Sequence, residues 1–403
     1  MVIYTIMTGV PLRPKKPYFA SGPCNKHPHF SGLILASRAL LSRTHRSKAA
    51  EQRLKYAFIL TKKLLAIPDN YKLCMIPGSN TGVIECAIWN MLGLRNIDVM
   101  CWDPYGDLWY KNITEELKLT RMVYVNKISC PKGQAPFQEQ LYHNPDNDLV
   151  FVWNATPTGV CIPNLDWINV ERDGLTIVDA TSAVFGLHCD WNKIDVLGFS
   201  WQKMLGGEGG LGMMVLSPRA IQRINGYHPE RPIPTLYRIR DTKTGKFNLA
   251  LAEGRSINTY SLLLLEDYIM ALEWVTEIGG VAATCAIVRK NHKIICDWVN
   301  TQDWIDFIVD KDQKEYRSPT TSALRITNGY DKKNGVKALI NFITGVLEEA
   351  NIAYDIKGHK SLPDTLRIWT GPTICPNDLK LLLEWITWCK DNPNYFIEPK
   401  KKR

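Results

Sequence analysis

Several features are scarce or missing in this chain of 403 residues. No uninterrupted apolar stretch reaches the roughly 18 residues that a helix needs to span a bilayer, so we expect no membrane partner. The apolar residues 1–10 lack a basic start and a small-residue cleavage site, which argues against a signal peptide. No short repeat or dominant block of charge occurs, which excludes collagen-like, coiled-coil and disordered classes.

Cysteine is present without a metal-binding or redox pattern. The 11 cysteines are scattered along the chain, and no two of them form a C-x-x-C pair. This spacing excludes zinc ribbons and thioredoxin-like redox motifs, and we expect no metal. An odd, dispersed set is typical of reduced thiols, so we expect a cytoplasmic protein.

Charge is only mildly unbalanced. Lysine and arginine number 49 against 40 aspartates and glutamates, for a net charge of +9, and basic residues cluster only in the tail 400–403. No basic stripe interleaves with aromatic residues, so we expect no nucleic-acid partner. Anionic small molecules are better suited to a mildly basic protein.

Short apolar strands alternate with helices through the first two thirds of the chain. Strands are expected near 73–76, 99–102, 122–125, 149–153, 175–178, 196–199 and 213–216, and helices near 47–66 and 83–92. Because these strands are apolar at successive positions, they predict an α/β fold with a mostly parallel sheet flanked by helices.

The pattern changes after about residue 261. Long helices are expected at 263–278 and 281–300, then short strands near 305–309, 322–326 and 366–369, with helices near 336–350 and 378–389. This order is typical of a smaller α+β domain. The length also favours two domains, and we divide the chain into an N-terminal segment (1–16), a large domain (17–265) and a C-terminal domain (266–403).

Two charged residues follow buried strands in this pattern. Lys203 comes just after the strand that ends near Ser200, where burial would lower its pKa and a neutral amine could form an imine with a carbonyl. Asp179 ends the preceding strand, at the ligand-binding edge of a parallel sheet. Such a lysine and an acid facing a ring nitrogen are the arrangement that binds pyridoxal phosphate. Taken singly, Lys203 is more typical of a surface lysine at the end of a strand, and Asp179 fits a turn aspartate equally well.

Two further segments could contact such a cofactor. The small-residue turn 78–82 precedes a helix, so its N–H groups and hydroxyls could bind a phosphate, although a simple helix cap has the same pattern. Trp109 follows the strand near 99–102, where an indole could stack on a planar ring or belong to the core.

Together these residues resemble a known enzyme family. Over most of its length the chain resembles the fold-type I, class V pyridoxal-phosphate aminotransferases, and among them the phosphoserine aminotransferases. The motifs that carry the resemblance are Tyr18-Phe-Ala-Ser-Gly-Pro, His45-Arg-Ser-Lys, Pro77-Gly-Ser-Asn-Thr-Gly, Asn154-Ala-Thr, Ser200-Trp-Gln-Lys, Ile257-Asn-Thr and Leu366-Arg-Ile-Trp.

The resemblance implies pyridoxal 5′-phosphate as the cofactor. Lys203 would form the covalent bond to it and move the reacting proton, while Asp179 would pair with the ring nitrogen. Further contacts to the ring, its phenolic oxygen and its phosphate would come from Trp109, Thr156, Ser79, Asn80 and Gln202. The resemblance also implies a homodimer with a shared active site, because Asn258 and Thr259 would reach the phosphate from the second subunit.

The resemblance also implies how the substrate is held. His45 and Arg46 would bind the distal phosphate or the γ-carboxylate of glutamate, although the residues alone also fit a solvated helix start. Arg367 would bind the α-carboxylate with its forked guanidinium group. His359 and Lys360 lie near a family His-Arg pair, where lysine keeps the charge and loses the fork.

The implied activity is amino transfer between O-phospho-L-serine and 2-oxoglutarate, which gives 3-phosphooxypyruvate and L-glutamate in serine biosynthesis. One alternative is another class V enzyme, such as an alanine or serine:glyoxylate aminotransferase or a cysteine desulfurase. A desulfurase needs a mobile nucleophilic cysteine, and Cys375 before a proline is more typical of a helix start. A non-catalytic regulator is the other alternative, but such proteins usually lose the lysine that Lys203 represents.

Overall fold

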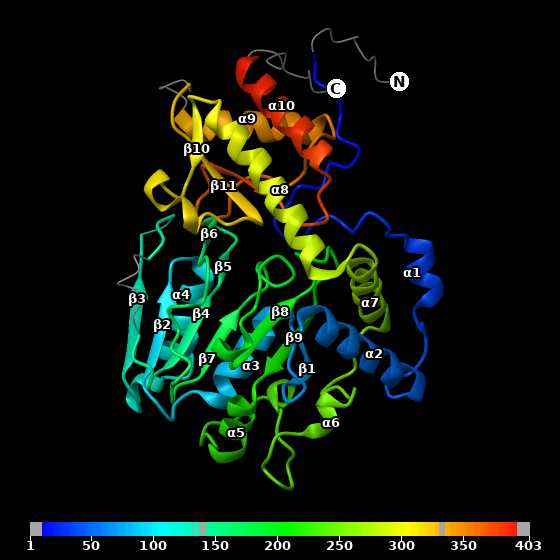
Figure 1. Ribbon diagram of the computed structural model, residues 1–403, viewed down its shortest axis with the longest axis vertical. Helices are drawn as coiled ribbons and strands as arrows, with labels where there is room; N and C mark the ends of the chain where they lie inside the picture. Colours follow the sequence, from blue (N-terminus) through cyan, green and yellow to red (C-terminus); the bar gives the residue numbers. More distant parts are fainter. Residues whose placement is uncertain (1–9, 132, 137–140, 142, 330–334, 393–403) are drawn as a thin grey trace, which may run out of the picture.

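Seven strands form a sheet that Figure 1 shows below a smaller one. The computed structural model describes residues 10–131, 133–136, 141, 143–329 and 335–392, so the basic tail and most of the segment 1–16 lie outside the described residues. The sheet has the order β1-β9-β8-β7-β4-β2-β3. Its strands are β1 (Lys72–Pro77), β2 (Ile97–Cys101), β3 (Val125–Ser129), β4 (Asp148–Val152), β7 (Thr176–Asp179), β8 (Val196–Ser200) and β9 (Leu211–Leu216).

Only β9 runs antiparallel to its neighbours in this sheet, so the predicted mostly parallel sheet is confirmed. Both faces are buried, which explains the continuous apolar strands. Along β4, Leu149 and Phe151 join the hydrophobic cluster on one face, whereas Val150 and Val152 join the cluster on the other. Helix α3 (Ser79–Met91) packs against β1, β7, β8 and β9, and α4 (Pro104–Lys111) packs against β2 and β4.

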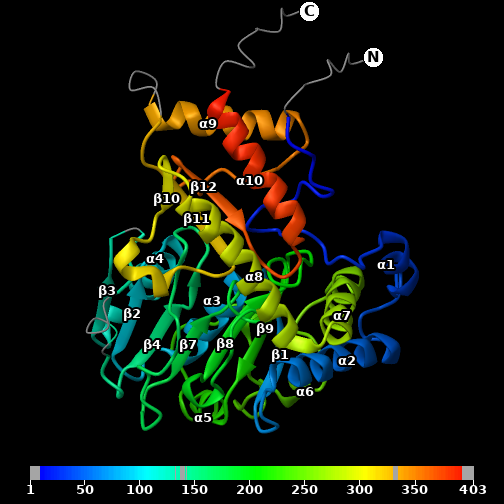
Figure 2. The ribbon, with the colours of Figure 1, turned by 45° about the horizontal axis from the view of Figure 1, so that its top comes forward.

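The smaller sheet is antiparallel and has the order β10-β11-β12. Its strands are β10 (Ile305–Phe307), β11 (Thr321–Ile326) and β12 (Thr365–Trp369), and Figure 2 shows α8 (Gly280–Asn300), α9 (Gly335–Glu349) and α10 (Pro376–Asp391) beside it. The predicted α+β pattern is confirmed. The domain boundary predicted near residue 265 falls in the first turn of α7 (Leu262–Glu277), which packs on α2 (Lys48–Leu65) and α8, and the boundary stays a prediction.

The remaining elements are short. They are α1 (Gly32–Arg38), α5 (Pro218–Gly226), α6 (Leu249–Ala252), the two-stranded hairpin of β5 (Asn154–Ala155) and β6 (Val160–Cys161), and a few single helical turns. Within the described residues, no single helix is long and apolar enough to cross a membrane, and α7 and α8 meet that test only as a pair bent by 85°.

Two predicted boundaries were wrong for local reasons. The helix expected to begin at Val83 begins at Ser79, because Gly78 takes a left-handed φ of 86° and serves as its N-cap. The predicted turn is therefore the first turn of α3. The strand expected at 122–125 begins only at Val125, because a helical turn at Leu119–Arg121 precedes it.

The segment before α1 connects the small sheet to the loop that carries Lys203. The Trp369 N–H of β12 donates to the Phe19 carbonyl over 3.0 Å, and the Cys24 N–H donates to the Gln202 carbonyl over 2.8 Å. The residues between Phe19 and Cys24 therefore run from one sheet toward the active-site edge of the other.

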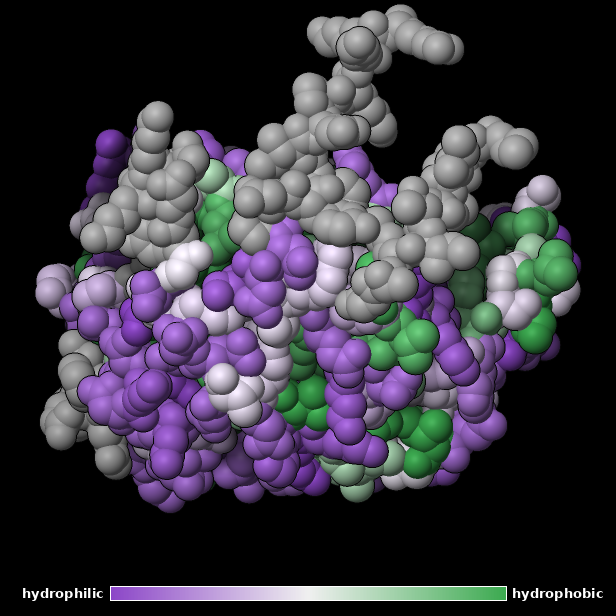
Figure 3. All heavy atoms as spheres, turned by 90° about the horizontal axis from the view of Figure 1, so that it is seen from above, coloured by the Kyte–Doolittle hydropathy of each residue, from purple (hydrophilic) through white to green (hydrophobic). Residues whose placement is uncertain are grey.

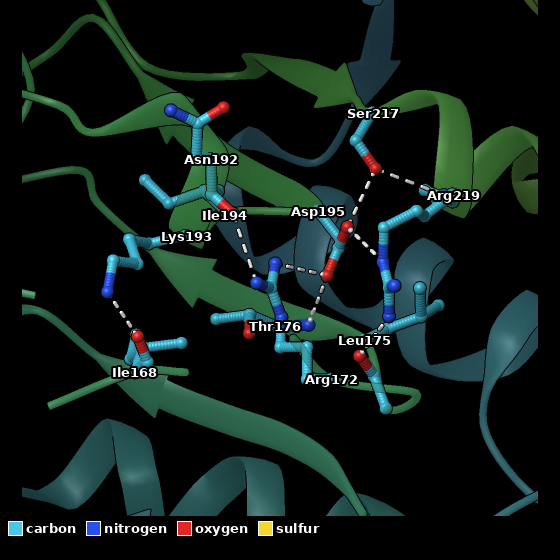
Figure 4. Close-up of polar contacts among 12 residues, drawn as sticks. Ile168, Arg172, Leu175, Thr176, Asn192, Lys193, Ile194, Asp195, Ser217 and Arg219 are labelled. Carbon is cyan, nitrogen blue, oxygen red and sulfur yellow. Dashed lines mark hydrogen bonds and ion pairs between the residues drawn. The ribbon is translucent and has the colours of Figure 1, made fainter. Parts of the chain in front are cut away.

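A buried cluster of charges lies at the end of the large sheet where β8 begins, opposite to the end where Lys203 follows that strand (Figure 4). Asp195, which is 1% exposed and precedes β8, accepts hydrogen bonds from Arg172 (2.8 Å), from the Thr176 N–H (2.9 Å) and from Ser217 (2.8 Å). Arg219 adds an ion pair of 3.2 Å. Because both carboxylate oxygens are satisfied, this buried charge stabilises the junction of β7, β8 and β9.

Candidate active site

A pocket opens at the carboxyl edge of the parallel strands, where loops and helix starts meet and α/β folds bind ligands. It is lined by Ser79, Asn80, Thr81, Tyr105, Trp109, Val152, Asn154, Thr156, Asp179, Thr181, Ser182, Gln202 and Lys203. Every predicted cofactor contact except Asn258 and Thr259 is therefore in one pocket.

Lys203 is half-buried in this pocket and is held by a hydroxyl group. Its Nζ donates a hydrogen bond of 2.7 Å to Thr156 Oγ1, and the Thr156 and Ser182 hydroxyls are hydrogen-bonded to each other. Burial lowers the pKa of Lys203 to about 8, and the positive charge of Arg367 acts in the same direction. A larger share of this amine is neutral near pH 7 than for an ordinary lysine, which suits it to nucleophilic and proton-transfer chemistry.

Asp179 at the end of β7 receives three hydrogen bonds on the same oxygen. Its Oδ1 accepts from Asn80 Nδ2 over 2.5 Å and from the N–H and hydroxyl of Thr181 over 3.3 and 3.1 Å. Burial raises the pKa of Asp179, while these donors and the charge of Lys203 oppose the rise. Gly198 in β8 makes room for this arrangement, because a Cβ there would lie 2.4 Å from Asn80 Oδ1.

The first three residues of α3 line the pocket. Gly82 N–H closes the first turn onto the Gly78 carbonyl, so the N–H groups of Ser79, Asn80 and Thr81 precede the first helical hydrogen bond. Gly212 in β9 permits this close approach, since a Cβ there would lie 2.7 Å from the Ser79 carbonyl oxygen. Helix starts of this kind attract anions.

Helix α4 supplies the aromatic side of the pocket. Trp109 is 1% exposed, and its indole Nε1 has no hydrogen-bond partner among the described residues. Asp103 caps the helix by accepting from the Gly106 N–H over 2.8 Å, and burial raises the pKa of Asp103 to about 7. Asp103 was not predicted from the sequence, although an aspartate followed by Pro104 is a recognisable helix-start signal.

Arg367 approaches the pocket from the small sheet. It lies on β12 and is half-buried. Its charge adds to the lowering of the Lys203 pKa by burial and partly opposes the raising of the Cys24 pKa by burial. Its Nε is a buried donor without a partner within the described ranges. His359 and Lys360 precede β12 and are not among the pocket-lining residues; His359 shares a hydrogen bond of 2.8 Å with Ser361.

Four predicted site residues lie together elsewhere on the same chain. The His45 ring packs edge-on against Tyr260 with centroids 5.6 Å apart, and Tyr260 directly follows Asn258 and Thr259. Neither these two residues nor His45 and Arg46 line the pocket. Within one copy of the chain, the structure therefore does not bring these four residues to Lys203.

Comparison with curated protein sequences shows the family of this chain. No protein-family model matches the chain. The chain is 41% identical over 380 residues to the phosphoserine aminotransferase of Methanosarcina mazei, which covers 94% of this chain and 98% of that protein. The phosphoserine aminotransferase of Methanosarcina barkeri is 40% identical over 375 residues, covering 93% and 97%.

Solved structures show the same fold. A phosphoserine aminotransferase from Cytophaga hutchinsonii matches with a TM-score of 0.75 at 22% identity and covers 93% of this chain and 98% of that one. A phosphoserine aminotransferase with bound pyridoxal phosphate from Trichomonas vaginalis matches with a TM-score of 0.76 at 17% identity, covering 93% and 100%.

Proposed function

The chain belongs to the phosphoserine aminotransferase family, and from this we propose how its own residues perform the family's reaction. It transfers the amino group between O-phospho-L-serine and 2-oxoglutarate, with pyridoxal phosphate as the cofactor. The observation that carries the proposal for the site is the single pocket that holds Lys203, Asp179 and Trp109.

The residues of the pocket fit that cofactor. One buried donor, Trp109 Nε1, and two buried acceptors, Gln202 Oε1 and Asn80 Oδ1, have no partner in the described part of the chain. The donor suits an oxygen of the cofactor, and the acceptors suit its protonated groups. The start of α3 can receive the phosphate on its N–H groups. Asp179 suits a protonated ring nitrogen, since three donors occupy its Oδ1 and none of the described residues donates to Oδ2. When bound, the cofactor supplies an electron sink for the charge left at the substrate Cα.

Lys203 is the residue that binds the cofactor and moves the proton. Its amine would hold the cofactor covalently when no amino acid is present. As a free amine, Nζ is held at the pocket by its hydrogen bond to Thr156 Oγ1. The lowered pKa of Lys203 would let this amine take the proton from the substrate Cα and deliver it to C4′ of the bound cofactor, as amino transfer requires.

Cations outside the pocket would bind the substrate's anionic groups. Arg367 offers an unpartnered Nε and a planar fork to the α-carboxylate. His45 and Arg46 would bind the phosphate of phosphoserine or the γ-carboxylate of glutamate. Because these two residues do not reach the pocket of their own chain, a second copy must supply them.

A homodimer with a shared active site is therefore part of the proposal. Apolar side chains that a monomer would leave exposed gather on α1, α2, α6, α7 and the loop before α2, and Figure 3 shows hydrophobic surface on the side where α1 lies. They include Leu33, Leu41, Ile59, Leu249 and Leu263. Exposed apolar patches of this kind are typical of protein interfaces. Sedimentation at micromolar concentration should show a dimer, and a fully active monomer would contradict the shared site.

We also propose a cytoplasmic location, since 11 dispersed cysteines suit a reducing compartment. Fractionation of cells that express the protein tests this, and recovery in a secreted or membrane fraction would contradict it.

The proposed function is tested by comparing amino donors. The purified protein with pyridoxal phosphate should transfer the amino group from O-phosphoserine and glutamate at least tenfold faster than from alanine or serine, as expected if the site binds a distal anion. A preference for alanine or serine would instead favour a glyoxylate-type aminotransferase.

A further inference from the structure

Tyr105 lies at the open side of the active-site pocket. It is the second residue of α4 and lines the pocket together with Lys203 and Asp179. It is 37% exposed, whereas Trp109 on the same helix is buried. Within the chain as described, the Tyr105 hydroxyl makes no hydrogen bond, so it is available to a ligand.

Arg367 is a positively charged residue whose charge acts on the pKa of the Tyr105 hydroxyl. Burial raises the pKa of Tyr105 and the charge of Arg367 partly opposes that rise, while burial lowers the pKa of Arg367 and Tyr105 partly opposes that fall. Figures 1 and 2 show α4 at the side of the large sheet that faces the small one, and Figure 2 shows β12, which carries Arg367, in that small sheet.

The Tyr105 hydroxyl remains a donor at neutral pH. Burial and the charges of Asp179 and Asp103 raise its pKa, which outweighs the opposite effect of Arg367. A protonated phenol donates one hydrogen bond, and a guanidinium group donates two in a plane. A carboxylate between them can accept from both side chains.

We propose that the Tyr105 hydroxyl donates a hydrogen bond to the α-carboxylate that Arg367 binds, so that Tyr105 is a further substrate-binding residue. The proposal rests on the proposed function, because it places an amino-acid substrate at Arg367. The α-carboxylate is common to every amino acid, so loss of the hydroxyl should weaken all amino donors by the same factor. A contact with the distal phosphate would weaken phosphoserine and leave alanine unchanged.

The test compares Tyr105→Phe with Tyr110→Phe. Both substitutions remove one phenol oxygen from α4, but Tyr110 packs under the Lys127 ammonium, 5.0 Å from its ring centroid, and does not line the pocket. Half-reactions with O-phosphoserine, glutamate and alanine would be measured for both variants and the wild type. A second measurement is the dissociation constant of α-methylglutamate, which lacks a Cα proton and therefore reports binding alone.

Tyr105→Phe should raise KM for all three donors and the α-methylglutamate dissociation constant by roughly tenfold, with kcat within about twofold. Tyr110→Phe should match the wild type. Unchanged constants in Tyr105→Phe, or a loss restricted to phosphoserine and glutamate, would overturn the proposal. If the wild type preferred alanine, the proposed function would fail separately, and the ratio across the three donors would still test Tyr105.

Discussion

The side-chain amide of Asn80 donates a hydrogen bond of 2.5 Å to Oδ1 of Asp179. The first turn of α3 thereby orients the carboxylate at the end of β7, and the missing side chain of Gly198 leaves the space for it. We predicted Asn80 as a phosphate contact, and that role stays a prediction. In the structure its Nδ2 is already engaged, whereas its backbone N–H lies at the helix start.

Replacing Asp179 with asparagine should lower the rate of amino transfer while the protein still binds the cofactor. Asparagine keeps the size of the side chain and loses the charge that favours a protonated ring nitrogen, so the cofactor should still bind while kcat falls roughly tenfold or more. Cofactor retention after dialysis and half-reaction rates with O-phosphoserine would be measured. Asp107→Asn, at an exposed ion pair on α4, is the control. Unchanged turnover in Asp179→Asn would show that this residue only forms a turn.

Replacing Arg46 with alanine should discriminate among substrates. A hydrogen bond from a charged group contributes about 1.5 to 3 kcal/mol, so kcat/KM for phosphoserine and glutamate should fall by about one to two powers of ten. Alanine presents no distal anion and should be little affected. Arg43→Ala, an exposed neighbour, is the control. Equal losses for all three donors would mean that Arg46 supports the fold.

Much of the fold could be predicted from the sequence because both faces of the large sheet are buried. Buried strands such as β4 are apolar at every position after the first, which is Asp148, and helices such as α2 have clear ends, with Ser47 capping the start and Ala66 taking a left-handed φ of 49° at the end. The start of α3 was missed because the left-handed conformation of Gly78 is not visible in a run of small residues.

The site was only partly predictable for a different reason. Lys203 and Asp179 follow strands, so the parallel sheet alone predicts that they meet. Tyr105 and Ser182 carry no such signal, because each is an ordinary residue until the fold places it in the pocket. The bond between Asn80 and Asp179 joins residues 99 positions apart and depends on how α3 packs against the sheet.

The His27 ring should make stability depend on pH. It stacks on Trp274 at a centroid distance of 5.5 Å, both its nitrogens lack partners among the described residues, and burial lowers its pKa from 6.5 to about 4. Between these values the unfolded chain binds more protons than the folded one, so the free energy of unfolding rises with pH from 4 to 6.5, by up to about 3 kcal/mol.

Thermal midpoints at pH 5 and pH 7 test this effect. His27→Phe keeps an aromatic ring against Trp274 and should reduce the difference between the two midpoints, whereas His29→Phe, at an exposed pair with Glu277, should not. A pH difference as large in His27→Phe as in the wild type would mean that other groups cause the acid sensitivity.

Replacing Asp195 with asparagine should lower the free energy of unfolding and leave the catalysed reaction unchanged. In Asp195→Asn the buried guanidinium of Arg172 loses its charged partner, which costs about 3 to 5 kcal/mol, so the thermal midpoint should fall by roughly 5 °C or more. Asp173→Asn removes an exposed ion pair with Arg95 and should change little. Because the Asp195 cluster lies at the opposite edge of the sheet, kcat/KM of the folded variant should equal that of the wild type.

The most direct measurement of the central claim is borohydride reduction of the protein loaded with pyridoxal phosphate, followed by peptide mapping, with and without O-phosphoserine. The account predicts a cofactor label on the peptide that contains Lys203. Prior incubation with O-phosphoserine should abolish that label, because amino transfer removes the reducible link, whereas incubation with alanine should largely preserve it. A label on another lysine, or a Lys203 label that O-phosphoserine leaves intact, would contradict the account.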